Sequence, residues 1–163
     1  MREAFAHTRF DRRLDIVGRM LMRDKPEAPF QFWDMYRMTI FDTLSDTMLA
    51  EMEDNAAVSL AAARNALRLV TAPEARAMVE QTVVSAERRY YLATSARHYL
   101  RARKAAAAGS VAEARAAMVQ CLAEGQKLIR AATKLGIEYP MAVHEDDIYE
   151  RYLGFQKTLG NAP

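Results

Sequence analysis

The sequence predicts an all-α protein, an elongated up-and-down bundle of four to five helices that forms a single domain over residues 1–163. Apolar residues recur every three or four positions, which is the spacing of one helix face, and no useful length alternates with a period of two. The runs between breaks are rich in Ala, Leu, Met, Arg and Glu, which favour helix. The five prolines and six glycines stand mainly at the breaks.

Two helices are expected in the first 70 residues. The first covers about Thr8 to Arg23 and stops before Pro26. The second starts near Pro29. Its apolar stripe is Phe41, Leu44, Met48, Met52, Ala56, Leu60, Ala63, Leu67 and Val70. The polar cluster at residues 53–55 leaves open whether this run is one helix or two.

Two capping boxes are expected to start the next two helices. Thr71 would be the N-cap of a helix that has Pro73 in its first turn and Glu74 reaching back. Ser110 and Glu113 form the second box, directly after Gly109 ends the preceding helix. The short connections predict antiparallel neighbours. A helix over residues 72–108 would be about 55 Å long at 1.5 Å per residue, which makes the bundle elongated.

The buried stripes predicted for these later helices follow the same spacing. In the third helix they are Val79, Val83, Ala86, Tyr90, Ala93 and Leu100. In the fourth they are Ala114, Met118, Leu122, Gly125, Ile129 and Ala132, and the helix ends at Gly136. A last helix fits residues 144–159, with an acidic start that suits the positive end of the helix dipole.

Composition limits the class of protein. The chain is 51% hydrophobic and 27% charged, and it contains no run of roughly 20 apolar residues that could cross a membrane. We find no secretory signal and expect a cytoplasmic protein without membrane partners. A single cysteine, Cys121, excludes an internal disulfide and a cysteine metal cluster, and three scattered histidines offer little to a metal. We therefore expect no cofactor and no metal.

No catalytic pattern stands out, so we expect a protein that is not an enzyme. The letters of residues 146–150 resemble the aspartate-rich motif of prenyl-transferring helical enzymes, but the likeness covers five residues and an acidic helix start explains it. The carboxylates Asp42, Asp46 and Glu53 can share a helix face, yet no histidine follows a glutamate by three, as a di-iron bundle requires. Cys121 falls on or beside an apolar stripe, where a cysteine is a small buried hydrophobe.

Charge is segregated along the chain. Residues 26–54 carry a net charge of −6 and residues 55–109 carry +6. One interpretation is that an acidic helix lies beside a basic one and neutralises it. The other is that Arg97, Arg101 and Lys104 bind a phosphate backbone, which would make the chain a small helical subunit of a nucleoprotein complex.

The segment from Phe30 to Phe41 is rich in aromatic residues and methionine, and its apolar side chains cover more than one helix face. Protein interfaces favour these residue types. We therefore predict a helical interaction or assembly subunit, either a homo-oligomer or part of a protein complex; the accessory subunit of a larger enzyme is an alternative. The predicted interface residues are Phe30, Phe32, Trp33, Tyr36 and Phe41.

Overall fold

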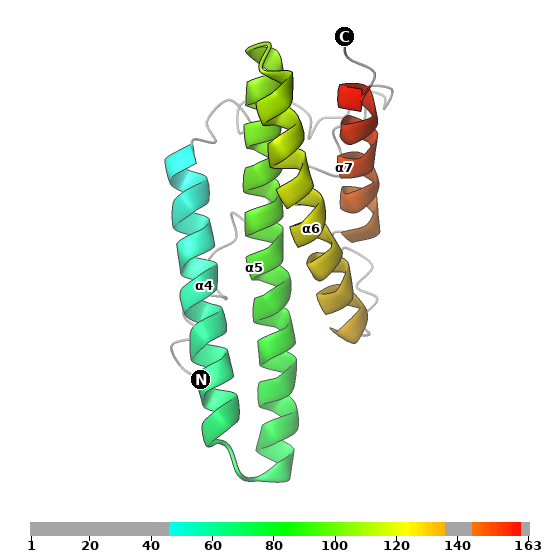
Figure 1. Cartoon of the computed structure of the whole chain (residues 1–163). Coiled ribbons are helices and arrows are strands. Elements are labelled where there is room, and N and C mark those ends of the chain that lie inside the picture. Colours follow the sequence, from blue (N-terminus) through cyan, green and yellow to red (C-terminus); the bar gives the residue numbers. More distant parts are fainter. Residues whose placement is uncertain (1–45, 136–144, 161–163) are drawn as a thin grey trace, which may run out of the picture.

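The computed structural model describes residues 46–135 and 145–160, and these residues form four helices and no strand. The helices are α4 (Asp46–Leu69), α5 (Pro73–Ala107), α6 (Val111–Leu135) and α7 (Glu145–Gly160). Successive helices run in opposite directions in an elongated bundle, with α5 between α4 and α6, and α7 on the far side of α6 (Figure 1). The predicted all-α bundle is confirmed. The expected helix over residues 8–23 and the start near Pro29 lie outside the described residues.

Helix α4 runs without a break through the polar cluster at residues 53–55. The helix buries its apolar stripe on α5. The buried members of α4 are Leu49, Met52, Ala56, Ser59, Leu60 and Ala63. Polar residues do not interrupt the helix because they face away from that stripe: Asp54 is exposed, whereas Met52 and Ala56 on either side are buried.

The capping box predicted at Thr71 is wrong. Helix α5 begins at Pro73, and its N-cap is Ala72, whose backbone is extended (φ −70°, ψ 126°) and which makes no side-chain cap hydrogen bond. The reason lies in Pro73, which lacks an N–H and has its φ fixed near the helical value, so it takes the first helical position itself. The residue before a proline is held in extended backbone, and this makes Ala72 the boundary.

The end of α5 follows the prediction. Gly109 has a φ of +79°, a conformation that an L-residue with a side chain adopts only with strain. The N–H of Ser110 donates to the carbonyl of Ala105 (2.9 Å), and that of Gly109 to the carbonyl of Ala106 (3.0 Å). These two bonds form a Schellman motif, which satisfies the last carbonyls of the helix. Helix α6 then begins at Val111, directly after Ser110.

The core joins all four helices, and α5 is its centre. Leu92, Ala93, Thr94, Ser95 and Ala96 are all buried. Five consecutive residues point in every direction around a helix axis, so α5 is enclosed on all sides at this level. This explains why the predicted single stripe is incomplete here: Ala93 is buried as expected, but Tyr90 and Leu100 are only half-buried.

The stripe predicted for α6 is correct in its first half and shifted in its second. Ala114, Met118 and Gly125 are buried as predicted, and so is Cys121. Leu128 and Ala131 are buried where Ile129 and Ala132 were expected, and Leu122 is half-buried. The shift follows from the position of α6 between α5 and α7. On a helix that packs against two neighbours, the most buried residues are those that face the space between the two neighbours. No helix in the described ranges is long and apolar enough to span a membrane.

Candidate functional site

The predicted aromatic interface lies outside the described residues. This applies to all five of its members: Phe30, Phe32, Trp33, Tyr36 and Phe41. Their role as an interface therefore stays a prediction. The described helices contribute three further features: the basic end of α5, a charged flank of the α4–α5 pair, and an apolar flank opposite it.

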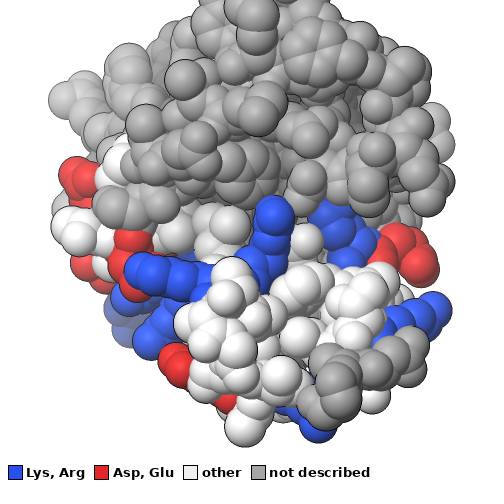
Figure 2. Space-filling view, turned by 90° about the horizontal axis from the view of Figure 1, so that it is seen from above, with Lys and Arg blue, Asp and Glu red and all other residues white. Residues whose placement is uncertain are grey.

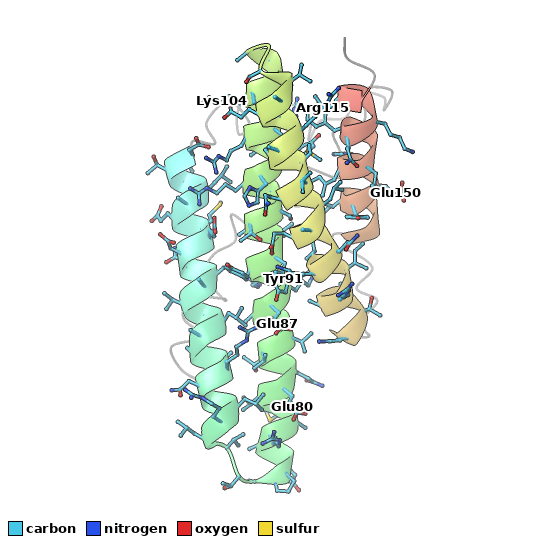
Figure 3. The ribbon with its side chains drawn as sticks, in the orientation of Figure 1. Glu80, Glu87, Tyr91, Lys104, Arg115 and Glu150 are labelled. Carbon is cyan, nitrogen blue, oxygen red and sulfur yellow. The ribbon has the colours of Figure 1, made fainter. Side chains whose placement is uncertain are left out.

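The basic end of α5 contains the predicted phosphate-binding residues. Arg97, Arg101 and Lys104 are spaced by four and three, so they share one side of the helix. Arg101 and Lys104 are exposed, and Lys104 lies at the end of the bundle with the α5–α6 turn (Figure 3). In Figure 2, which looks onto that end, Lys and Arg side chains gather beside an uncharged area. Two of the three side chains are thus available to an anion.

Arg97 differs from the other two because it already has a partner within the chain. Its Nη1 donates to Oε2 of Glu53 on α4 at 2.6 Å, and the two side chains are only 31% and 25% exposed. The Nε of Arg97 is buried and has no hydrogen-bond partner among the described residues. Since a phosphate would have to displace Glu53, Arg97 is a weaker candidate for binding than Arg101 or Lys104.

A second ion pair fixes the register of α4 against α5. Nη2 of Arg64 donates to Oε1 of Glu87 at 2.9 Å. The hydrogen bond that Arg64 donates to Glu87 raises the pKa of Arg64. In an antiparallel pair, residues near the start of α4 face residues near the end of α5. The Arg97–Glu53 and Arg64–Glu87 pairs share one such register, which places the acidic start of α4 beside the basic end of α5. The neutralising interpretation of the charge pattern therefore accounts for the Arg97–Glu53 pair, whereas Arg64 and Glu87 both belong to the basic stretch of residues 55–109.

The charged flank continues from α5 to α6. We define it by Arg64, Glu87, Tyr91, Glu124 and Lys127. Lys127 donates to Glu124 at 2.7 Å, and its Nζ lies 5.7 Å from the centre of the Tyr91 ring. Contact with Glu124 raises the pKa of Lys127. Figure 3 shows Glu87 and Tyr91 on successive turns of α5. The Arg64–Glu87 pair joins α4 to α5, and the contact of Lys127 with the Tyr91 ring joins α6 to α5, whereas the Lys127–Glu124 pair lies within α6.

The apolar flank lies on the other side of the α4–α5 pair. We define it by Val58, Leu69 and Met78, whose exposed fractions are 42%, 72% and 62%. Val58 and Leu69 are eleven residues apart, which is about three turns, so they share one side of α4. Met78 is nine residues from Glu87, which puts it roughly 180° around α5 from the charged flank. Three of the four large apolar side chains that are exposed in the described residues therefore belong to this flank.

Sequence reasoning missed the apolar flank because it searched for the main stripe of each helix. A search for a second stripe would have found Val58 and Leu69 in α4. Met78 could not have been assigned to the same side, because its direction relative to α4 depends on the register of the two helices.

A buried aromatic cluster fixes α7 to the rest of the bundle. Tyr152 is fully buried, and its hydroxyl lies 3.2 Å from Oγ of Ser95 on α5. Its ring centre is 5.1 Å from that of Tyr99, which also meets Phe155 edge to face at 5.5 Å. Burial raises the pKa of Tyr152 well above its ordinary value. This tyrosine therefore stays protonated and acts as a structural hydrogen-bond partner.

The approach of α7 to α6 depends on a glycine. A Cβ atom at Gly125 would lie 2.8 Å from Cδ2 of Tyr149, closer than real Cβ contacts. At the other end of α7, Nη2 of Arg115 donates to the carbonyl of Leu159 at 2.7 Å. This gives one of the last carbonyls of the helix a hydrogen-bond partner. The sequence indicated that Gly125 faces the core, but not that a tyrosine lies against it.

Cys121 and the carboxylates were the sequence candidates for a nucleophile and a metal site. Cys121 is buried, as predicted, and burial raises the pKa of its thiol, which opposes the thiolate that a nucleophile needs. No group of three or more His, Cys, Asp or Glu side chains in residues 46–135 and 148–160 could hold a metal ion. Asp42 lies outside the described residues.

Comparison with known proteins finds no family model that matches the chain, and no similar curated protein or solved structure.

Proposed function

We propose that this chain is a helical interaction or assembly subunit that acts through the aromatic and methionine-rich segment from Phe30 to Phe41. The observation that carries the proposal is the width of the apolar surface of that segment. On a helix, Phe32, Trp33 and Met38 would point about 100° or more apart, so a single neighbouring helix could not cover all three. A partner chain would cover the remainder.

The arrangement of the described helices supports this proposal. Their own apolar stripes are buried in a core to which α4, α5, α6 and α7 all contribute. Phe30, Trp33 and Tyr36 are thus apolar residues additional to a core that already has members from four helices. Large aromatic side chains at the centre of an interface supply much of its binding energy.

The alternative is a subunit that binds a nucleic-acid backbone, and the exposure of Arg101 and Lys104 favours it. The Arg97–Glu53 pair opposes it, because the acidic start of α4 lies beside the same basic residues and would repel a polyanion. Binding of this kind weakens steeply with salt, since each neutralised phosphate releases counterions.

The substitution Trp33→Ala tests the proposal. We expect the variant to keep its helical circular dichroism and to lose its partner or its oligomeric mass, because the hot spot of the interface is truncated. Trp33→Phe is the matched control, since it keeps an aromatic ring and should retain most of the association. An unchanged mass and an unchanged fold in Trp33→Ala would contradict the proposal.

A further inference from the structure

We infer that α7 is a detachable cover of the bundle, which leaves the face formed by α5 and α6 while α4, α5 and α6 stay folded. Its release uncovers an apolar surface around Tyr99 and Cys121, both of which are buried when α7 is docked. The inference concerns a conformational change of the described helices and does not rest on the proposed function.

Helix α7 is held by one side only. Its buried side chains are Ile148, Tyr152 and Leu159, spaced by four and seven, which is a single stripe. Positions 150, 154, 156–158 and 160 are exposed, and α7 lies at the edge of the bundle (Figure 1). Helix α5, by contrast, is enclosed on all sides at residues 92–96. Elements with few buried contacts open at a lower free energy than the core of a protein, so α7 is the first of the described helices expected to open.

The sequence of α7 weakens this helix further. Gly154 lies in its interior and is exposed, and a Cβ atom there would meet nothing within 4 Å. Packing therefore does not require glycine at this position, unlike at Gly125 of α6, which Tyr149 approaches closely. A glycine inside a helix lowers the equilibrium constant for helix formation about four- to fivefold relative to alanine. Gly154 thus shifts the balance towards the released form.

The contacts among α4, α5 and α6 do not need α7. The Arg97–Glu53 and Arg64–Glu87 ion pairs join α4 to α5. A separate buried cluster joins the same two helices and contains no residue of α7; its members are Leu60, Ala63, Val83 and Ala86. Helix α6 packs more extensively on α5 than on α7. The three helices therefore keep their mutual contacts when α7 leaves.

The surface beneath α7 is apolar and contains the cysteine. The ring of Tyr99 meets the rings of Tyr152 and Phe155 at 5.1 and 5.5 Å between centres. Cys121 lies one turn before Gly125, so it shares the side of α6 that faces Tyr152. Both side chains lose part of their cover when α7 leaves. Because this surface accepts the apolar stripe of α7, it has the character of a groove for an amphipathic helix.

The thiol of Cys121 reports the release, because it is the single cysteine of the chain. Its labelling rate in the native full chain is measured at low urea concentrations, with reagent dilute enough that the rate follows the population of the open form. We expect this rate to rise with urea less steeply than the equilibrium constant for global unfolding measured by circular dichroism. The reason is that release of a 16-residue helix exposes much less surface than unfolding of the whole bundle.

The same measurement gives two results that overturn the inference. If the labelling rate rises with urea as steeply as global unfolding, Cys121 becomes accessible only when the whole bundle unfolds. If the rate does not depend on urea at all, the reagent reaches Cys121 while α7 is in place.

Two substitutions separate the release of α7 from the unfolding of the bundle. Gly154→Ala should slow the labelling of Cys121 about four- to fivefold, because alanine stabilises the docked helix. Val83→Ala is the control, since it removes methyl groups from the α4–α5 cluster that contains no residue of α7. It should lower the urea midpoint of global unfolding and leave the labelling rate without urea unchanged. A labelling rate that Gly154→Ala does not slow, or that Val83→Ala raises as much as it raises global unfolding, overturns the inference.

Discussion

The contact between α6 and α7 gives the sharpest prediction, because one helical glycine is crowded and another is free. At Gly125 an added Cβ would lie 2.8 Å from Cδ2 of Tyr149 and 3.3 Å from Cδ2 of Tyr152. At Gly154, inside α7, it would meet nothing within 4 Å. Gly125→Ala and Gly154→Ala therefore make the same chemical change in a helix, once with a clash and once without.

The magnitudes follow from two opposing effects. Replacing a helical glycine with alanine stabilises a helix by about 0.8–1 kcal/mol. Overpacking a filled site costs about 1–3 kcal/mol. Tyr152 cannot yield easily because it is fully buried and its hydroxyl is close to Ser95, so we expect the clash to offset the gain at Gly125. Gly154→Ala should raise the free energy of unfolding by about 0.5–1 kcal/mol. The free energy of unfolding of Gly125→Ala should be lower than that of Gly154→Ala by about 1–3 kcal/mol.

Urea unfolding followed by far-UV circular dichroism measures this difference. The slope of the free energy of unfolding against urea concentration should be the same for both variants, so a difference in their midpoints reports a difference in stability alone. Near-UV circular dichroism should change in Gly125→Ala, because Tyr149 and Tyr152 must move. If Gly125→Ala is as stable as Gly154→Ala, α7 does not approach α6 as closely as described.

The remaining predictions concern the Arg97–Glu53 ion pair, the half-buried His98 and the buried Cys121. Glu53→Ala should lower the free energy of unfolding by about 1 kcal/mol, because it leaves the half-buried Arg97 without its partner; a double-mutant cycle with Arg97→Ala that shows no coupling would contradict this. Burial lowers the pKa of His98 from its ordinary value of 6.5, so the unfolded chain takes up the proton first and stability should fall as pH drops below about 6.5. His98→Gln should remove that part of the pH dependence in urea titrations between pH 5.5 and 7.5, and an unchanged dependence would refute it. Cys121 should react with a thiol reagent on the order of 100-fold more slowly in the native protein than in urea, and equal rates would show that its burial is wrong.

Much of the fold could be predicted from the sequence because its helix boundaries are local. Gly109 has the left-handed backbone that ends α5, and Pro73 starts it. The same local reasoning failed at Thr71, because a proline at the first helical position moves the boundary to the residue before it. The regular spacing of Met52, Ala56 and Ala63 was enough to identify the buried side of α4.

The parts that could not be predicted depend on the register between helices. Arg97 and Glu53 are 44 residues apart, so the charge pattern indicated attraction between two segments without naming the pair. Arg64 and Glu87 are 23 apart and lie in the same basic stretch, so the charge pattern did not indicate their pairing. The shift of the α6 stripe towards Leu128 needs α7 in place beside α6. The proposed function depends on residues 30–41, whose composition suggests an interface and whose partner an assembly measurement would identify.

The most direct test of the interaction role is the native mass of the full chain, measured by light scattering after size exclusion with absorbance read at 260 and 280 nm. The account predicts a defined multiple of 18.4 kDa and the absorbance ratio of pure protein, and dissociation when Trp33 is replaced by alanine. A single chain of 18.4 kDa whose mass and fold do not respond to Trp33→Ala would contradict it. So would a peak with excess absorbance at 260 nm that disappears in high salt, which would point instead to Arg101 and Lys104 and a bound nucleic acid.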